Sequence, residues 1–173
     1  MKAVTEENIA EHSAQVAQIA HALAVIGNRI YGKDLNVDRI TTLALYHESS
    51  EVITGDLPTP IKYYNPDIRK AYKEIESVAN DKLLSMLPEE LKEDYAPLIS
   101  QDENGYEHRL VKAADKLSAY IKCIEEMKSG NREFAKAEIS LKASVEEYFD
   151  LPEVKYFCDK FIPSFGKTLD ELD

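Results

Sequence analysis

The sequence has little glycine, only two cysteines and no long hydrophobic run. No apolar stretch approaches the roughly 18 to 20 residues that span a bilayer, and the N-terminus lacks a basic segment followed by an apolar one. Cys123 and Cys158 stand far apart without a metal-ligand spacing, and a chain of 173 residues does not need a disulfide for stability. We therefore expect an unexported, cytoplasmic protein with two reduced thiols.

Basic residues are also in deficit. Thirty-two acidic residues stand against 21 basic ones, for a formal net charge of −11. A field of this sign repels phosphate backbones and offers no counterion release, which argues against nucleic-acid binding. A small anionic substrate would need a local positive element, such as a metal ion.

The amount of core-forming sequence bounds the domain count. A chain of 173 residues with 44% hydrophobic content is long enough for one ordinary domain with a substantial core and too short for two comfortable ones. We therefore expect a single domain covering residues 1–173.

Apolar residues repeat every three to four positions in nearly every segment, and no strand-length run alternates cleanly, so we predict an all-α fold. Asn8 and Glu11 have the spacing of a capping box, and Asn65 with Pro66 is typical of a helix start. Helices are predicted after Asn8, from Asn36 to about Gly55, from Asn65, after Pro88, and over about 107–128, 133–149 and 152–162; residues 54–64 are predicted to be non-helical.

Three of these helices carry a potential metal ligand on or beside the apolar stripe. They are His12 on the first, His47 with Glu48 on the second, and Asp115 on the helix over 107–128. Each has an ordinary alternative, since a lone histidine can be a satisfied core residue and Asp115 can pair with Lys112 or Lys116. Burying all of them without partners costs roughly several kcal/mol, whereas one divalent cation satisfies them together. Imidazole and carboxylate ligands without thiolate suit Mn²⁺, Co²⁺, Fe²⁺ or Zn²⁺.

The order of these residues resembles the signature of a known family. The segments E-H-S at 11–13, Y-H-E-S-S-E-V-I-T-G-D-L-P-T-P at 46–60 and V-K-A-A-D at 111–115 resemble the H…HD…D signature of HD-domain proteins. More narrowly, they look like the YfbR-type 5′-deoxynucleotidases. The likeness runs from about residue 7 through F-I-P-S-F at 161–165, nearly the whole chain.

The resemblance implies an HD-type helical bundle and a metal-dependent enzyme that hydrolyses deoxyribonucleoside 5′-monophosphates. It implies that one divalent ion is held by His12, His47, Glu48 and Asp115. It also implies that three of these residues, His12, Glu48 and Asp115, border the substrate. Family likeness and the aromatic-rich C-terminal part suggest a homodimer. The helical periodicity places Glu51 one turn beyond His47 on the same face, within reach of a metal-bound water.

The resemblance also assigns roles around the metal. Glu51 is the candidate acid/base or water-orienting residue, unless it is a helix-surface carboxylate. Asp56 and Thr59, in the proline-restricted segment, are the candidate substrate contacts, unless that segment is only a rigid connection. A carboxylate such as Asp56 suits a sugar hydroxyl better than a phosphate.

The sequence departs from the family at two places. The second residue of the histidine-carboxylate pair is Glu48, where the family has aspartate, so the carboxylate stands on an arm one methylene longer. Family members also carry an N-terminal Arg-Trp pair that orients phosphate and nucleoside, and no residue of this sequence, which contains no tryptophan, can be assigned those roles.

Two other functions are compatible with part of this pattern. One keeps the metal and changes the substrate to a cyclic nucleotide, a deoxyribonucleoside triphosphate or a guanosine polyphosphate, and the T-G-D-L-P-T-P segment argues against it. The other is a helical binding protein with a decayed metal site, for which Glu48 and the missing Arg-Trp pair are the support.

Overall fold

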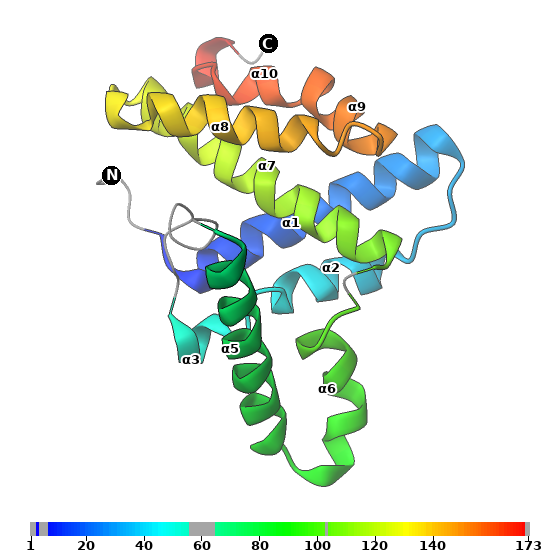
Figure 1. Cartoon of the computed structure of the whole chain (residues 1–173). Helices are drawn as coiled ribbons and strands as arrows, with labels where there is room; N and C mark the ends of the chain where they lie inside the picture. The colour runs from blue at the N-terminus through cyan, green and yellow to red at the C-terminus, as the bar shows by residue number, and fades with distance from the viewer. Residues whose placement is uncertain (1–2, 4–6, 56–64, 103, 172–173) are drawn as a thin grey trace. The chain divides into compact units, whose positions relative to one another are not determined.

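The computed structural model describes residues 3, 7–55, 65–102 and 104–171, and all regular structure in these ranges is helical, as predicted (Figure 1). Its elements are α1 (Ile9–Tyr31), α2 (Val37–Tyr46), α3 (Glu51–Thr54), α5 (Pro66–Ser85), η1 (Glu89–Leu91), α6 (Lys92–Ile99), α7 (Tyr106–Lys128), η2 (Arg132–Phe134), α8 (Ala135–Glu146), α9 (Pro152–Lys160), α10 (Ile162–Phe165) and η3 (Leu169–Glu171). None of these helices combines the length and apolar character needed to cross a membrane.

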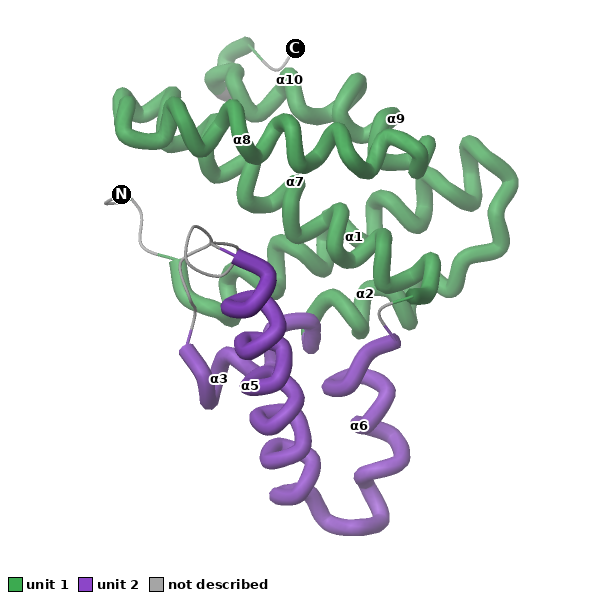
Figure 2. The backbone as a smooth tube through the Cα atoms, in the orientation of Figure 1, with its two compact units in different colours: residues 1–45, 104–173 green, residues 46–103 purple. Residues whose placement is uncertain are grey.

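The chain forms two compact units. Residues 1–45 and 104–173 make up unit 1, and residues 46–103 make up unit 2 (Figure 2). The expectation of one domain over 1–173 remains a prediction.

Helix α1 begins as the sequence predicts. The Asn8 side chain accepts a hydrogen bond from the Glu11 backbone N–H, and the Glu11 carboxylate accepts one from the Asn8 N–H, which completes the capping box. Gly32 ends the helix at φ 64°, in the left-handed region where a side chain would be strained. The apolar stripe of this helix is buried; it consists of Val16, Ile19, Leu23 and Ile26.

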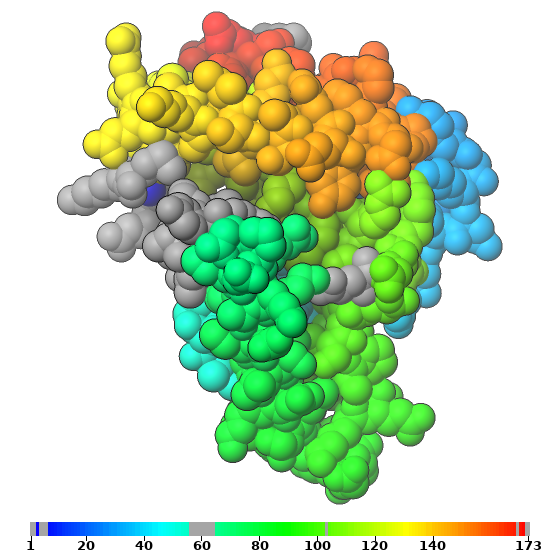
Figure 3. Space-filling view, viewed as in Figure 1, coloured from blue at the N-terminus to red at the C-terminus, as the bar shows by residue number. Residues whose placement is uncertain are grey.

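The core of unit 1 lies around α1 and α7. These helices pack against each other, α9 packs on α1, and α8 packs on α7. Leu110, Leu117 and Ile121 on α7 are fully buried. On the face shown in Figure 3, α8 lies over α7 and forms the outer surface. Unit 1 is therefore held by two long central helices whose apolar faces are covered from both sides.

Helix α2 is shorter than predicted. Asn36 caps it as expected, with its side chain accepting from the Arg39 N–H at 3.0 Å, but the helix ends at Tyr46. Residues 47–50 form a turn in which the Ser49 hydroxyl and N–H both donate to the Tyr46 carbonyl. Serine side chains compete in this way with helical hydrogen bonding. The prediction of one continuous helix through Glu51 is therefore wrong.

Unit 2 contains α3, α5 and α6. The Asn65 side chain accepts from the Ile68 N–H at 2.8 Å and starts α5, as predicted. The predicted apolar side of α5 is only partly buried: Tyr72 is buried, whereas Ile75 and Val78 are exposed and line a groove of about 600 Å³ with residues of α3. The predicted helix is therefore present, with part of its apolar side exposed.

The C-terminal helices follow the predicted order with shorter bounds. The segment predicted over 133–149 forms η2 and then α8, and the segment over 152–162 is divided into α9 and α10. Phe157 is buried in the core, while Phe161 is exposed beside it. The aromatic residues of this region thus only partly close the core.

Candidate metal centre

The first half of the candidate site joins α1 and α7 within unit 1. His12 stands in the first turns of α1 and Asp115 near the middle of α7, with His12 Nε2 3.3 Å from Asp115 Oδ1. The other carboxylate oxygen, Asp115 Oδ2, lies 3.0 Å from Lys116 Nζ, so the ion pair considered as an alternative is present as well. Two residues separated by about a hundred positions in the sequence are thus brought into direct contact.

The second half lies in the turn that follows α2. His47 Nε2 is 3.6 Å from Glu48 Oε1, and the His47 side chain is only 2% exposed, against 22% for Glu48. Their backbone is held by hydrogen bonds of the turn, including Glu51 N–H to the Glu48 carbonyl at 3.0 Å. A buried imidazole beside a partly exposed carboxylate is a fitting arrangement for metal ligands that leave room for substrate.

Glu51 is the first residue of α3 and is 4% exposed. The alternative of a helix-surface carboxylate is therefore wrong. The expected geometry, with Glu51 one helical turn beyond His47, is also wrong because the turn at 47–50 separates the two residues. Glu51 is nevertheless tied to this turn, because its backbone N–H donates to the Glu48 carbonyl at 3.0 Å.

The donor set has the chemistry that a divalent cation requires. Among the described residues, one group of histidine, aspartate and glutamate side chains is able to hold a metal ion, and it consists of His12, His47, Glu48 and Asp115. It offers two imidazoles and two carboxylates without a thiolate, which fits a borderline or hard divalent ion. The prediction of a candidate metal site is confirmed at this level.

The predicted substrate contacts Asp56 and Thr59 lie outside the described residues, so their roles remain predictions.

The structure also shows polar partners of this site that the sequence did not suggest. Glu7 Oε1 lies 3.8 Å from His12 Nδ1, and the Glu7 carboxylate also pairs with Lys122. The Ser118 hydroxyl donates to Gln15 Oε1 at 2.6 Å, three residues beyond Asp115 on one helix and three beyond His12 on the other. No sequence spacing indicates these contacts, because they depend on how α1 and α7 cross.

Comparison with solved structures gives the class of protein. The chain is similar to an HD-domain phosphohydrolase from Listeria innocua, with a TM-score of 0.82, 26% sequence identity, and coverage of 95% of this chain and 79% of that one. The predicted HD-type all-α fold is thereby confirmed.

Comparison with sequences gives the family. A family model described as 5′-deoxynucleotidase YfbR-like matches residues 1–165. A 5′-deoxynucleotidase of Vibrio parahaemolyticus is 54% identical over 99% of this chain and 89% of the relative, and the 5′-deoxynucleotidase YfbR of Escherichia coli is 52% identical over 99% and 86%. This chain belongs to the YfbR-like 5′-deoxynucleotidase family, and the prediction of a hydrolase of this kind is confirmed.

Proposed function

We propose that this protein is a metal-dependent phosphomonoesterase that converts deoxyribonucleoside 5′-monophosphates into deoxyribonucleosides and phosphate. The observation that carries the proposal is the group of two histidines and two carboxylates in a chain that belongs to the YfbR-like family. An acidic protein with a formal charge of −11 needs such a site, because its own field repels a phosphate dianion.

His12, His47, Glu48 and Asp115 are the proposed ligands of one divalent ion. When bound, the ion supplies a Lewis acid for the phosphoryl oxygens and lowers the pKa of water. The protein contributes the geometry: His12 and Asp115 are held in contact by two packed helices, and His47 is buried against Glu48 in the turn. We further propose that His12, Glu48 and Asp115 border the bound phosphate.

Glu51 is the proposed catalytic acid/base. Its carboxylate is buried, and a buried carboxylate beside a metal can take a proton from the attacking water and return it to the leaving 5′-oxygen. Asp56 and Thr59 are the proposed contacts to the nucleoside. The hydrogen-bond acceptors of Asp56 suit the 3′-hydroxyl of a deoxyribose.

Three further properties belong to this proposal. The ion is Co²⁺, Mn²⁺, Zn²⁺ or Fe²⁺, the set that accepts mixed imidazole and carboxylate ligands. The protein acts in the cytoplasm, where its buried Cys123 and half-buried Cys158 stay reduced. It works as a homodimer, for which the exposed Phe161 next to the buried Phe157 offers apolar surface.

Phosphate release from purified protein tests the proposal. The panel contains dAMP, dGMP, dCMP, dTMP and dUMP, each with Co²⁺ or Mn²⁺ and with EDTA, and deoxyadenosine 3′-monophosphate as the matched control for the position of the phosphate. We expect release from the 5′-monophosphates only, and only with metal. Parallel reactions with the Glu51→Gln protein control for contaminating phosphatases.

The same panel separates the competing functions. Cleavage of a cyclic nucleotide, a deoxyribonucleoside triphosphate or a guanosine polyphosphate in preference to dAMP would assign the metal site to another substrate. Tight nucleotide binding without metal-dependent turnover would instead support a binding protein.

A further inference from the structure

His12 faces two carboxylates with its two ring nitrogens. Nε2 lies 3.3 Å from Asp115 Oδ1, and Nδ1 lies 3.8 Å from Glu7 Oε1. An imidazole ligand binds a metal through one nitrogen and carries a proton on the other. Because the proposed ligand Asp115 faces Nε2, Nε2 is the nitrogen directed to the ion and Nδ1 is the nitrogen directed to Glu7.

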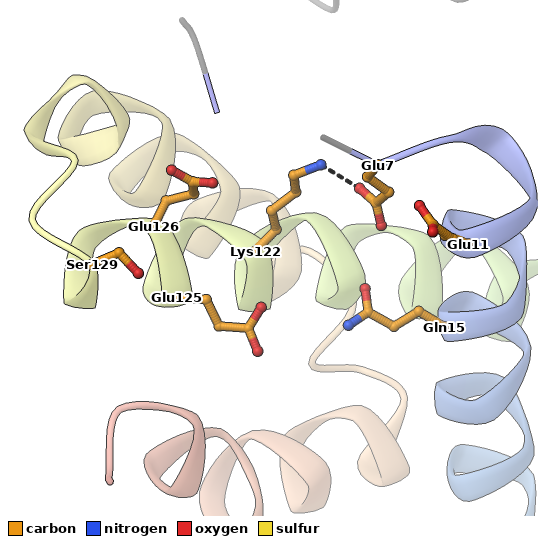
Figure 4. Close-up of a pocket in the computed structure, with 7 residues that line it drawn as sticks. All are labelled: Glu7, Glu11, Gln15, Lys122, Glu125, Glu126 and Ser129. Carbon is orange, nitrogen blue, oxygen red and sulfur yellow. Dashed lines mark hydrogen bonds and ion pairs between the residues drawn. The ribbon is translucent and has the colours of Figure 1, made fainter. Parts of the chain in front are cut away.

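Glu7 is itself held in place by α7. Its Oε2 pairs with Lys122 Nζ on α7 (Figure 4). The two carboxylate oxygens therefore have different partners, because Oε1 faces His12 on α1. Glu7 and His12 are both about four-fifths buried as side chains, at 21% and 18% exposure. Water therefore screens their interaction less than that of a fully exposed pair.

The helices beneath this pair are fixed by a polar contact. The buried Ser118 donates to Gln15 at 2.6 Å, within one turn of Asp115 and His12 respectively. This contact sets the spacing of α1 and α7 where they carry the two ligands. Glu7 and Lys122 line a pocket of about 310 Å³ together with Glu11 and Gln15 (Figure 4).

We propose that Glu7 is a positioning residue for the metal site. It accepts the Nδ1–H of His12, selects the tautomer with a free Nε2, and holds the ring in the orientation that Nε2 needs, while Lys122 holds Glu7. The inference rests on the proposed role of His12 as a metal ligand. Carboxylates that accept from the second nitrogen of a ligating histidine commonly raise metal affinity by about 10- to 100-fold.

The observed separation is compatible with this role. A hydrogen bond requires the 3.8 Å between Glu7 Oε1 and His12 Nδ1 to shorten by about 0.6 Å, to the 3.2 Å upper limit of ordinary N–H···O bonds. A metal ion on Nε2 would withdraw electron density from the ring and make the Nδ1–H a stronger hydrogen-bond donor, which favours the shorter distance to Glu7.

A purely structural role makes a different prediction. In that case Glu7 and Lys122 form only a partly exposed ion pair that attaches the residues before α1 to α7. Loss of the pair would then lower stability slightly and leave metal affinity unchanged. Metal affinity and the state of the His12 ring therefore distinguish the two roles.

The experiment uses the full chain and Zn²⁺ as the diamagnetic probe. Zinc affinity is measured by competition with a chromophoric chelator for wild type, Glu7→Gln and Glu11→Gln. Glu11→Gln is the matched control, because it removes the same charge from the same pocket wall while its amide oxygen can still accept from Asn8 in the capping box. We expect Glu7→Gln to bind zinc at least 10-fold more weakly and Glu11→Gln to stay within about twofold of wild type.

Nitrogen-15 spectra of histidine-labelled, zinc-loaded wild type provide a second measurement that needs no variant to fold. We expect His12 to bind zinc through Nε2 and to show a downfield, slowly exchanging Nδ1–H. Zinc on Nδ1, or equal affinities for the Glu7→Gln and Glu11→Gln proteins, would overturn the inference. Absence of zinc binding to wild type would instead contradict the proposed metal site itself, so the two failures are distinguishable.

Discussion

Glu51 differs from an ordinary helix-surface carboxylate because its side chain is buried. It is 4% exposed at the first position of α3, directly after the turn that carries two proposed metal ligands. We expect Glu51→Gln to retain metal and to lower turnover by about 10²-fold or more, the usual loss for a positioned acid/base. Metal content by elemental analysis and kcat with dAMP check this expectation. Loss of the ion from the variant would make Glu51 a ligand and contradict the division of roles.

Glu48 is the position where this chain differs from the family pattern. Its Oε1 lies 3.6 Å from His47 Nε2, so the longer side chain still reaches its neighbour. We expect Glu48→Asp to change metal affinity only modestly and to alter turnover. The reason is that the position of the ion, or the backbone around Glu48, would already be adjusted to the longer side chain.

The opposite result has its own meaning. If the longer arm has weakened the site, Glu48→Asp raises turnover by up to about 10²-fold, the cost of an ångström-scale misplacement. Assays of both proteins with dAMP and Mn²⁺, Co²⁺ or Zn²⁺ decide between the two outcomes. Absence of metal-dependent phosphate release from both proteins would defeat both.

At the scale of elements, an ion pair of the buried Glu153 with the partly exposed Lys33 connects segments of unit 1. Glu153 on α9 is fully buried, and both of its oxygens accept from Lys33 Nζ, at 2.9 and 3.0 Å. Tyr106, at the start of α7, donates to Glu153 Oε1 at 2.9 Å and also contacts Lys33. Gly27 on α1 leaves the necessary space, since a Cβ there would lie 3.0 Å from Glu153 Oε1.

We expect Lys33→Met to destabilise the protein by about 2 to 3 kcal/mol. The substitution leaves a buried carboxylate with one hydrogen bond from Tyr106, and removing one partner of a buried pair costs about 3 to 5 kcal/mol when both are fully buried. Lys155→Met is the matched control, because its ion pair with Asp159 is exposed and is worth less than about 1 kcal/mol. Urea unfolding measures both, and equal losses would show that the pair at Glu153 is not special.

The same cluster predicts a dependence on alkaline pH. Burial lowers the pKa of Lys33, but hydrogen bonds to Tyr106 and Glu153 and the charge of Glu153 outweigh it and raise that pKa above 10.5. Burial, as the largest cause, raises the pKa of Tyr106 above 10.0. Folding thus favours the protonated forms, so their contribution is complete below about pH 10 and is lost as pH rises through the raised values. We expect a shallower alkaline loss of unfolding free energy in Lys33→Met than in wild type.

At the scale of the whole molecule, the proposed ligands come from residues 12, 47, 48 and 115, which are far apart in the sequence. An ion that binds only the folded arrangement stabilises it, by about 2.7 kcal/mol at a concentration 100-fold above Kd. We expect Mn²⁺ or Co²⁺ to raise Tm by about 5 to 10 °C over the EDTA-treated protein. Differential scanning calorimetry measures the shift, and a His47→Asn protein should lose it; an equal shift in that variant would place the bound ion elsewhere.

The sequence by itself determined the features that depend on near neighbours. The capping box of Asn8 and Glu11 and the N-cap at Asn65 could be predicted because their hydrogen bonds span three residues. The order of the candidate ligands sufficed to indicate the family, since it does not depend on how the helices pack. The predicted all-α class followed from helical periodicity, which is also local.

Tertiary structure decided the features that depend on residues far apart. The exposure of Ile75 and Val78 on α5 depends on packing, which helical periodicity does not show. The contact of His12 with Asp115, and of Glu7 with His12 and Lys122, requires α1 and α7 to cross at one point. An ionisable residue has a chemical type in the sequence, but its partners and its burial exist only once the distant segments have packed.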